Sequence, residues 1–337
     1  MRWSLAIYRR VAATMDYFIG IDGGGTKTRL VAATFDGNKQ TILGRASGGS
    51  SNLAALPFDT VFANIQKLLH DLHSTSGLQL QHCRAICLGS AGATAGDNTA
   101  RLTQIFRMLG YSCALNIMND AEMVLFSQTR GQPGAILISG TGSIGYAINM
   151  AGDVRRVGGW GHLIDDGGSG YRLGMDAICA ALMDWDGRGA ATKLTHIVAK
   201  FFDGEKEDIA DVPRKITGYI YGTGFEKSKI AELAPLIRHA AEQGDVTAHT
   251  IEKNAATDLV HLAHTLIRHA GVNDCKKIVI SGGVILNNSH IRKMFEAGVL
   301  TAFPLVEVVE MAESAEIGAA WLAMQSCKEN SHLFSTE

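Results

Sequence analysis

The chain of 337 residues is long enough for two domains, each with a core that needs no disulfide. Its 31 basic and 33 acidic residues leave a net charge of −2, which gives no basic surface for a nucleic acid partner. The six cysteines form no Cys-x-x-Cys pair, and reduced thiols are typical of a cytoplasmic protein.

The N-terminal segment carries an apolar stretch of about five residues before Arg9-Arg10, too short for a signal sequence or a membrane span. We therefore expect no membrane partner. The first predicted strand, near 17–22, ends in Asp22, and three glycines follow it. Glycines have no side chain to keep an anion away from the backbone N–H groups, so this loop is a candidate phosphate site.

This first glycine loop is predicted to be the tip of a hairpin. The sequence lacks G-x-x-x-x-G-K-[ST], which excludes a Walker-type phosphate loop. The β-branched run T-K-T-R-L-V-A-A-T-F follows, so the chain returns as a strand near 28–36 instead of entering a helix. Similar transitions from strand to glycine recur at 136–146 and 278–284. One such loop is also compatible with an ordinary hairpin, but three favour two domains that bind one shared nucleotide.

The rest of the first half alternates between strand and helix. Strands are predicted near 40–47, 84–89 and 113–118, and helices near 57–73, 98–109 and 120–129. This order indicates a mixed sheet with helical crossovers on its faces. The turn-rich segment 130–134 interrupts the pattern, and strands at 135–139, 143–149 and 154–157 then repeat the opening meander.

The second half is predicted to be mostly helical over 171–270, with strands near 277–280 and 305–309. A helix at about 312–326, rich in small residues, is suited to close packing against the first domain. We therefore predict an α/β protein with an N-terminal domain at 16–130 and a C-terminal domain at 131–325. Residues 1–15 and 327–337 are expected to be tails.

Asp120 is the candidate catalytic residue, because it follows the strand L-N-I-M-N and precedes the apolar helix A-E-M-V-L-F. Ligand sites of open α/β sheets gather at such strand ends, and a helix N-terminus favours a carboxylate. Phosphoryl transfer needs one group to orient the attacking hydroxyl. The residue pattern leaves a second role open, because Asp is also a common helix N-cap.

Trp160 is a candidate sugar-binding residue, because it lies between Gly159 and Gly161. Its flat apolar face suits a pyranose ring, and the flanking glycines would expose it. The alternative is a tryptophan that anchors the core at a turn.

Taken together, these motifs resemble the actin-like ATPase superfamily. The segments at 47–53 (S-G-G-S-S-N-L), 119–121 (N-D-A) and 158–171 (G-G-W-G-H-L-I-D-D-G-G-S-G-Y) are similar to those of the N-acetylglucosamine kinases within the BadF/BadG-type ATPases. The resemblance runs from residue 16 to about 325. It implies two duplicated actin-like (ribonuclease H-like) domains with a nucleotide and sugar cleft between them.

The resemblance also implies an activity, namely transfer of phosphate from ATP to the 6-hydroxyl of N-acetyl-D-glucosamine. Glucosamine and N-acetylmuramic acid are the alternative amino-sugar substrates. The implied cofactors are ATP and Mg²⁺, and the implied assembly is a homodimer, which the sequence itself does not decide. The implied roles are metal binding for Asp22, general base for Asp120, phosphate binding for Gly24, Gly25, Thr26, Lys27, Gly140, Thr141 and Gly142, adenosine binding for Gly282 and Gly283, and sugar binding for Asn52, Asp120, Gly159, Trp160, Gly161 and Asp166.

The chain departs from the family pattern at Gly167, where relatives usually carry an acid that Asp165 could replace. Two other functions are alternatives. An activator ATPase of the same family needs an interface cysteine for an iron–sulfur cluster, and none lies between Cys113 and Cys179, neither of which is expected to be exposed. A regulator without turnover is disfavoured, because both proposed catalytic acids are present.

Overall fold

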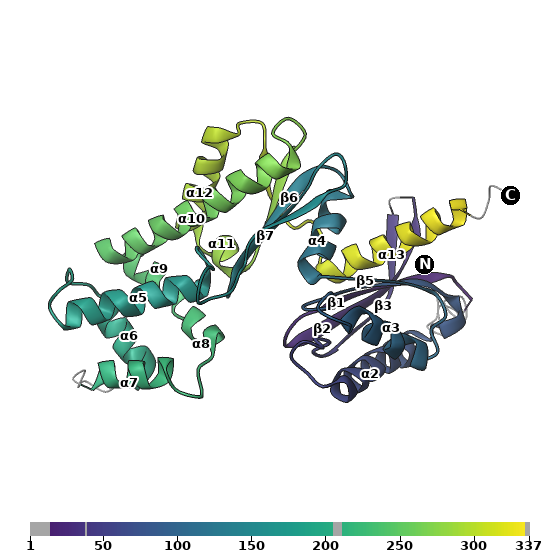
Figure 1. Cartoon of the computed structure of the whole chain (residues 1–337), viewed down its shortest axis with the longest axis horizontal. Coiled ribbons are helices and arrows are strands. Elements are labelled where there is room, and N and C mark those ends of the chain that lie inside the picture. The colour runs from purple at the N-terminus through teal and green to yellow at the C-terminus, as the bar shows by residue number, and fades with distance from the viewer. Residues whose placement is uncertain (1–13, 38, 205–210, 334–337) are drawn as a thin grey trace, which may run out of the picture. The chain divides into compact units, whose positions relative to one another are not determined.

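The computed structural model describes residues 14–37, 39–204 and 211–333, with side chains described as far as residue 327. Most of the predicted tail at 1–15 lies outside these residues. The chain divides into two compact units (Figure 1). Unit 1 comprises the chain up to Gly131 together with the segment from Ala312 onward, and unit 2 is Gln132–Met311.

Unit 1 contains a five-stranded mixed sheet in the order β3-β2-β1-β4-β5. Its strands are β1 (Tyr17–Gly23), β2 (Lys27–Asp36), β3 (Lys39–Gly49), β4 (Cys83–Ser90) and β5 (Ala114–Met118). β1, β2 and β3 form an antiparallel meander, whereas β4 and β5 continue parallel to β1. The first glycine loop therefore is a hairpin tip, as predicted, and the Gly24 N–H donates to the Lys27 carbonyl at 2.9 Å to close it.

Helices cover both faces of this sheet. α2 (Phe58–Ser76) and α3 (Asn98–Met108) bury one face, and α13 (Ala315–Leu333) packs on the other beside α4 (Asp120–Thr129). β2 shows the division, because Leu30 packs toward α2 while its neighbour Val31 packs toward α13. A Cβ on Gly20 would lie 2.0 Å from the Glu316 carbonyl, so only glycine lets α13 approach β1 this closely.

Unit 2 repeats the same sheet. Its order is β10-β9-β6-β7-β8, from β6 (Gly134–Ser139), β7 (Ser143–Ile148), β8 (Val154–Gly158), β9 (Lys277–Ser281) and β10 (Glu307–Glu310). β6 to β8 again form an antiparallel meander, and β9 and β10 again run parallel to its first strand. The internal duplication expected from the repeated strand-to-glycine pattern is confirmed.

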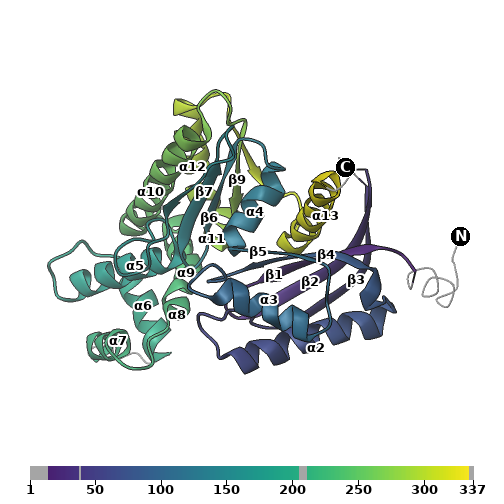
Figure 2. The ribbon, with the colours of Figure 1, turned by 45° about the vertical axis from the view of Figure 1, so that its right-hand side comes forward.

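The helices of unit 2 supply most of its core. α10 (Val246–Ala270) crosses the sheet over β6, β7 and β8 and packs lengthwise against α12 (Ser289–Ala302), as Figure 2 shows. The other helices are α5 (Gly170–Trp185), α6 (Leu194–Asp203), α7 (Val212–Ile220), α8 (Lys227–Ala231), α9 (Ala234–Glu242) and α11 (Gly283–Asn287). Of the helices in the described part of the chain, none combines the length and the apolar character that crossing a membrane requires.

Candidate active site

In unit 1, Asp22 lies at the carboxyl end of β1 in an acidic environment. Burial, together with the negative charges of Glu316 and Asp120, raises its pKa to about 6, while the Arg29 guanidinium opposes this shift. Three carboxyl groups from β1, α4 and α13 thus share one neighbourhood. A bound cation would relieve their mutual repulsion.

Glu316 is a site residue that no sequence motif indicated. It is buried, and its Oε1 accepts from the Arg45 guanidinium at 3.0 Å and from the Ser314 hydroxyl at 2.8 Å. Its Oε2 has no hydrogen-bond partner within the described structure. Because Mg²⁺ prefers oxygen ligands, this orphaned carboxylate oxygen beside Asp22 fits the implied metal. The only sequence signal was an acid in an otherwise small-residue helix.

Asp120 is not the N-cap of α4, the second role that the residue pattern left open. Asn119 is the N-cap of α4, and its side-chain oxygen accepts from the Ala121 N–H at 3.0 Å. Asp120 is the first residue inside the helix, and burial raises the pKa of its carboxyl against the opposing backbone N–H groups of Ala121 and Asp120. A half-buried carboxylate that does not serve as the helix cap is available for chemistry.

The tip of the first hairpin is open for a phosphate. Gly25, Thr26 and Lys27 are exposed, and a Cβ on Gly25 would meet nothing within 4 Å. Ser50, directly after β3, supports the tip by donating to the Gly24 carbonyl at 2.9 Å, and its Oγ also accepts from the Asn52 N–H at 3.1 Å. Ser50 thereby links the predicted phosphate loop to Asn52, one of the predicted sugar ligands of this unit.

In unit 2, the first residues of α5 form backbone hydrogen bonds to the second hairpin. The N–H groups of Gly170 and Tyr171 donate to the carbonyls of Gly140 and Thr141 at 2.8 and 3.1 Å. Ser139, the last residue of β6, donates to the Gly168 carbonyl at 2.8 Å and so ties the strand to the segment before α5.

Asp166 is placed differently from the expectation that it faces a sugar. Only 3% of the residue is exposed, its backbone has a φ of 67°, and its carboxylate accepts from the Ser143 N–H at 3.3 Å. The Lys227 ammonium lies 3.4 Å from the same carboxylate. In this structure Asp166 therefore braces the second hairpin, and its sugar contact stays a prediction.

Lys227 adds a positive charge to the second phosphate loop. A Cβ built on Gly142 would lie 3.2 Å from the Lys227 Nζ, so this ammonium lies directly beside the hairpin backbone. A cation there can neutralise phosphate oxygens bound at the loop. No motif indicated Lys227, because it lies in the mostly helical region 171–270, which carries no recognisable chemistry.

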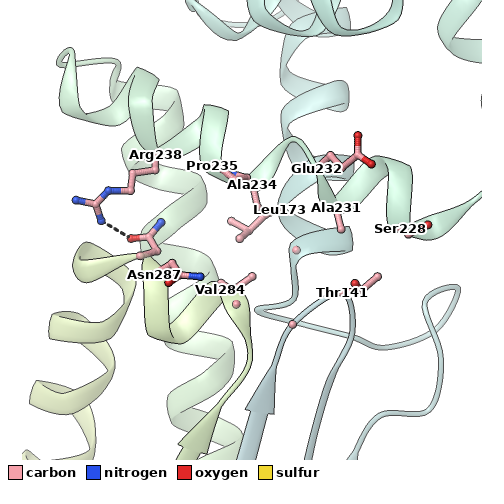
Figure 3. A pocket seen from close by; sticks show the side chains of 14 residues that line it. Thr141, Leu173, Ser228, Ala231, Glu232, Ala234, Pro235, Arg238, Val284 and Asn287 are labelled. Atoms are coloured by element: carbon pink, nitrogen blue, oxygen red, sulfur yellow. Dashed lines mark hydrogen bonds between the residues drawn. The ribbon is translucent and has the colours of Figure 1, made fainter. Parts of the chain in front are cut away.

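A cavity of about 540 Å³ opens next to the second hairpin, and Figure 3 shows its lining. Gly140, Thr141 and Gly283, all predicted nucleotide residues, line it together. Leu173, Ala231, Ala234, Pro235 and Val284 supply apolar surface, and Ser228, Glu232, Arg238, Asn287 and Asn288 supply polar groups. This size and mixture suit a purine nucleoside whose phosphates point to the glycine hairpin.

Gly283 lines this cavity, and Gly282 directly before it is the N-cap of α11. At Gly282, φ is 100° and a Cβ would lie 2.3 Å from the Ser139 carbonyl, whereas a Cβ on Gly283 would meet only Asn287 Nδ2, at 3.7 Å.

We expect Gly282→Ala to lower the free energy of unfolding by ~1–3 kcal/mol. Gly283→Ala should keep the wild-type stability but raise KM for ATP by ~10-fold, since its methyl group enters the cavity. Thermal unfolding and steady-state kinetics of both variants would check this, and an unstable Gly283→Ala protein would contradict it.

The predicted sugar segment forms an exposed turn. Gly159 and Gly161 have φ values of 71° and 105°, and Trp160 between them is 63% exposed, so the interpretation of Trp160 as a core anchor is wrong. The Arg156 guanidinium stacks over its ring at 4.3 Å. The backbone N–H of Trp160 donates to Asp165 Oδ2 at 3.0 Å, which ties this carboxylate into the turn.

The duplicated sheets, each with a glycine hairpin after its first strand, define an actin-like α/β fold. Within that class, the chain belongs to the BadF/BadG/BcrA/BcrD ATPase family, whose sequence profile matches residues 19–323.

Two curated relatives match nearly the whole chain. An N-acetylmuramic acid/N-acetylglucosamine kinase of Clostridium acetobutylicum is 34% identical over 93% of this chain and 100% of its own length. An N-acetyl-D-glucosamine kinase of Dictyostelium discoideum is 30% identical over 93% of this chain and 99% of its own length. A solved Chromobacterium violaceum structure, provisionally assigned as an N-acetylglucosamine kinase, has 26% identity and a TM-score of 0.69 over 92% of this chain and 99% of its own. The resemblance inferred from the sequence motifs is confirmed.

Proposed function

We propose that this protein transfers the terminal phosphoryl group of ATP to the 6-hydroxyl of an amino sugar, with N-acetyl-D-glucosamine as the preferred acceptor. The observation that carries the proposal is Asp120, a half-buried carboxylate at a strand end that is relieved of capping by Asn119. The ATPase family and the substrates named for the two curated relatives support the same reaction class.

In the proposed reaction, the Asp120 carboxylate accepts the proton of the sugar 6-hydroxyl while that oxygen attacks the terminal phosphorus. The new O–P bond forms as the bond to ADP breaks. A raised pKa brings Asp120 closer to the working pH, which favours general-base catalysis. Mg²⁺, when bound, would neutralise phosphate charge, with Asp22 and Glu316 as the residues that would hold it. The backbone N–H groups of the hairpin tips and Lys227 would position the phosphates.

A kinetic panel of sugars with ATP and Mg²⁺ tests the proposal. Phosphorylation of N-acetylglucosamine, N-acetylmuramic acid or glucosamine would support an amino-sugar kinase and identify its substrate. ATP hydrolysis without transfer to any of these sugars would contradict it.

The alternative of an iron–sulfur activator needs one correction. Cys179 is exposed, contrary to the sequence expectation, and Cys113 is half-buried. The sequence still provides no cysteine between these two positions. A cluster held by several cysteine ligands is therefore not supported by this segment.

The two glycine hairpins lie in different units, at Gly24 in unit 1 and Gly140 in unit 2. If one ATP uses both, ATP analogue and sugar together should make the molecule more compact, because the segment at 130–134 would act as a hinge. Small-angle scattering of the free and doubly liganded protein would measure this. Identical dimensions in both states would argue against a shared nucleotide.

The proposal also includes a cytoplasmic location, where ATP is available, and a homodimer. Sedimentation of the purified protein would test the oligomeric state. A monomer at all accessible concentrations would remove the dimer from the proposal without affecting the proposed chemistry.

A further inference from the structure

Two helices of unit 2 bring together a set of side chains for which the proposed kinase reaction has no use. His249 and Glu252 lie one turn apart on α10, and His290 lies at the start of α12. One potential ligand atom from each residue lies within 4.8 Å of the other two. The imidazole rings of His249 and His290 stack with centroids 5.7 Å apart.

Glu252 is the central member of this cluster. The residue has 0% exposure, its Oε1 accepts from Asn288 Nδ2 at 2.6 Å, and its Oε2 lies 3.1 Å from His290 Nδ1. A fully buried carboxylate is costly unless a positive charge compensates it. Among the described residues, its hydrogen-bond partners are a neutral amide and an imidazole.

His290 is the second residue of α12, and its Nδ1 lies 3.1 Å from the buried Glu252 carboxylate. Imidazole nitrogens are common metal ligands. A divalent metal ion would satisfy the buried carboxylate and both histidines at once.

We propose that His249, Glu252 and His290 form a binding site for a divalent transition metal ion of the Zn²⁺ class. Two imidazole nitrogens and one carboxylate oxygen are a donor set that zinc accepts, with the fourth position left for water. Tetrahedral binding needs donor atoms about 3.3 Å apart, so any separation near the 4.8 Å limit would have to contract by rotation of a side chain. His249 is exposed and free to make that rotation, and its exposure gives the metal a route from solvent.

The surrounding hydrogen bonds support this assignment. Arg238 donates to Asn288 Oδ1 at 3.1 Å, which orients the amide so that its Nδ2 donates to Glu252. Such outer hydrogen bonds fix a ligating carboxylate in position. Arg238 and Asn288 also line the 540 Å³ cavity, so the metal site adjoins the candidate nucleotide pocket through this pair.

The test uses Co²⁺ alone, as a spectroscopic substitute for Zn²⁺, on the full-length, metal-stripped protein without a histidine tag. We expect one equivalent of Co²⁺ to bind with the visible absorption of a tetrahedral site, Zn²⁺ to displace it, and the unfolding temperature to rise with either metal. His249→Ala removes an exposed ligand without disturbing the core. It should weaken Co²⁺ binding by more than the ~10–100-fold typical of losing an outer-shell partner.

His261→Ala is the matched control, because His261 is also an exposed histidine of α10 but lies outside the cluster. It should bind Co²⁺ as the wild-type protein does. Glu252→Gln, which keeps an oxygen for Asn288, should lose binding as His249→Ala does. The proposal is wrong if wild-type protein shows no tetrahedral Co²⁺ band, or if the His249 and His261 variants lose binding equally. These outcomes do not depend on kinase activity, so they test the metal site separately from the proposed function.

Discussion

Asp120→Asn is expected to lower kcat by about 10² or more while leaving ATP binding nearly intact. The amide keeps the size of the carboxylate and can still accept from the Ala121 N–H, as Asp120 Oδ1 does at 2.9 Å. It cannot take the proton of the sugar hydroxyl. Steady-state kinetics together with calorimetric titration of an ATP analogue would separate the loss of chemistry from any loss of binding.

The neighbouring residue provides the matched control. Asn119→Ala removes the N-cap of α4 and should lower the free energy of unfolding by ~1 kcal/mol, with a much smaller effect on kcat. Asp120→Asn should thus lose mainly kcat, and Asn119→Ala should lose mainly stability. A near-normal kcat for the Asp120→Asn variant would indicate that Asp120 only stabilises the start of the helix.

The fold could be predicted because its signals are local. Alternating apolar residues, glycine turns and helix-forming runs follow the chain in the same order twice, and the sheets of both units repeat that order. The small residues of the last helix also predicted close packing. Gly20 shows why, since its missing Cβ makes room for the backbone of α13.

The site was only partly predictable, because several of its contacts join residues far apart in the sequence. Glu316 belongs to the last helix, yet its charge acts on Asp22. Lys227 belongs to a segment with no motif, yet it lies beside the second hairpin. Asp166 carries a family motif, but its burial against Ser143 and Lys227 depends on tertiary packing. That Asn119 and not Asp120 is the cap of α4 became evident only from the backbone geometry of the turn.

We expect kcat/KM for N-acetylglucosamine to exceed that for glucosamine by about 10-fold or more, since burying one apolar group discriminates by ~1–3 kcal/mol. An acetamido group is neutral and presents a methyl group to bury. A free 2-amine is cationic and would need a nearby carboxylate. Asp165 is the acid of the sugar segment that could serve, and its carboxylate already accepts from the Trp160 N–H at 3.0 Å. The turn therefore already engages one oxygen of the carboxylate that an amine would require.

Two variants make this prediction specific. Trp160→Ala should weaken the acetylated sugar with little effect on ATP, because the exposed ring is removed while the backbone turn and its hydrogen bond to Asp165 can persist. Asp165→Asn keeps an acceptor for the Trp160 N–H and removes the charge, so it should leave the preference for N-acetylglucosamine unchanged. Initial rates with both sugars for all three proteins give the comparison. A wild-type enzyme that prefers glucosamine, and loses that preference in Asp165→Asn, would overturn the acetyl-group argument and identify Asp165 as the partner of the ammonium.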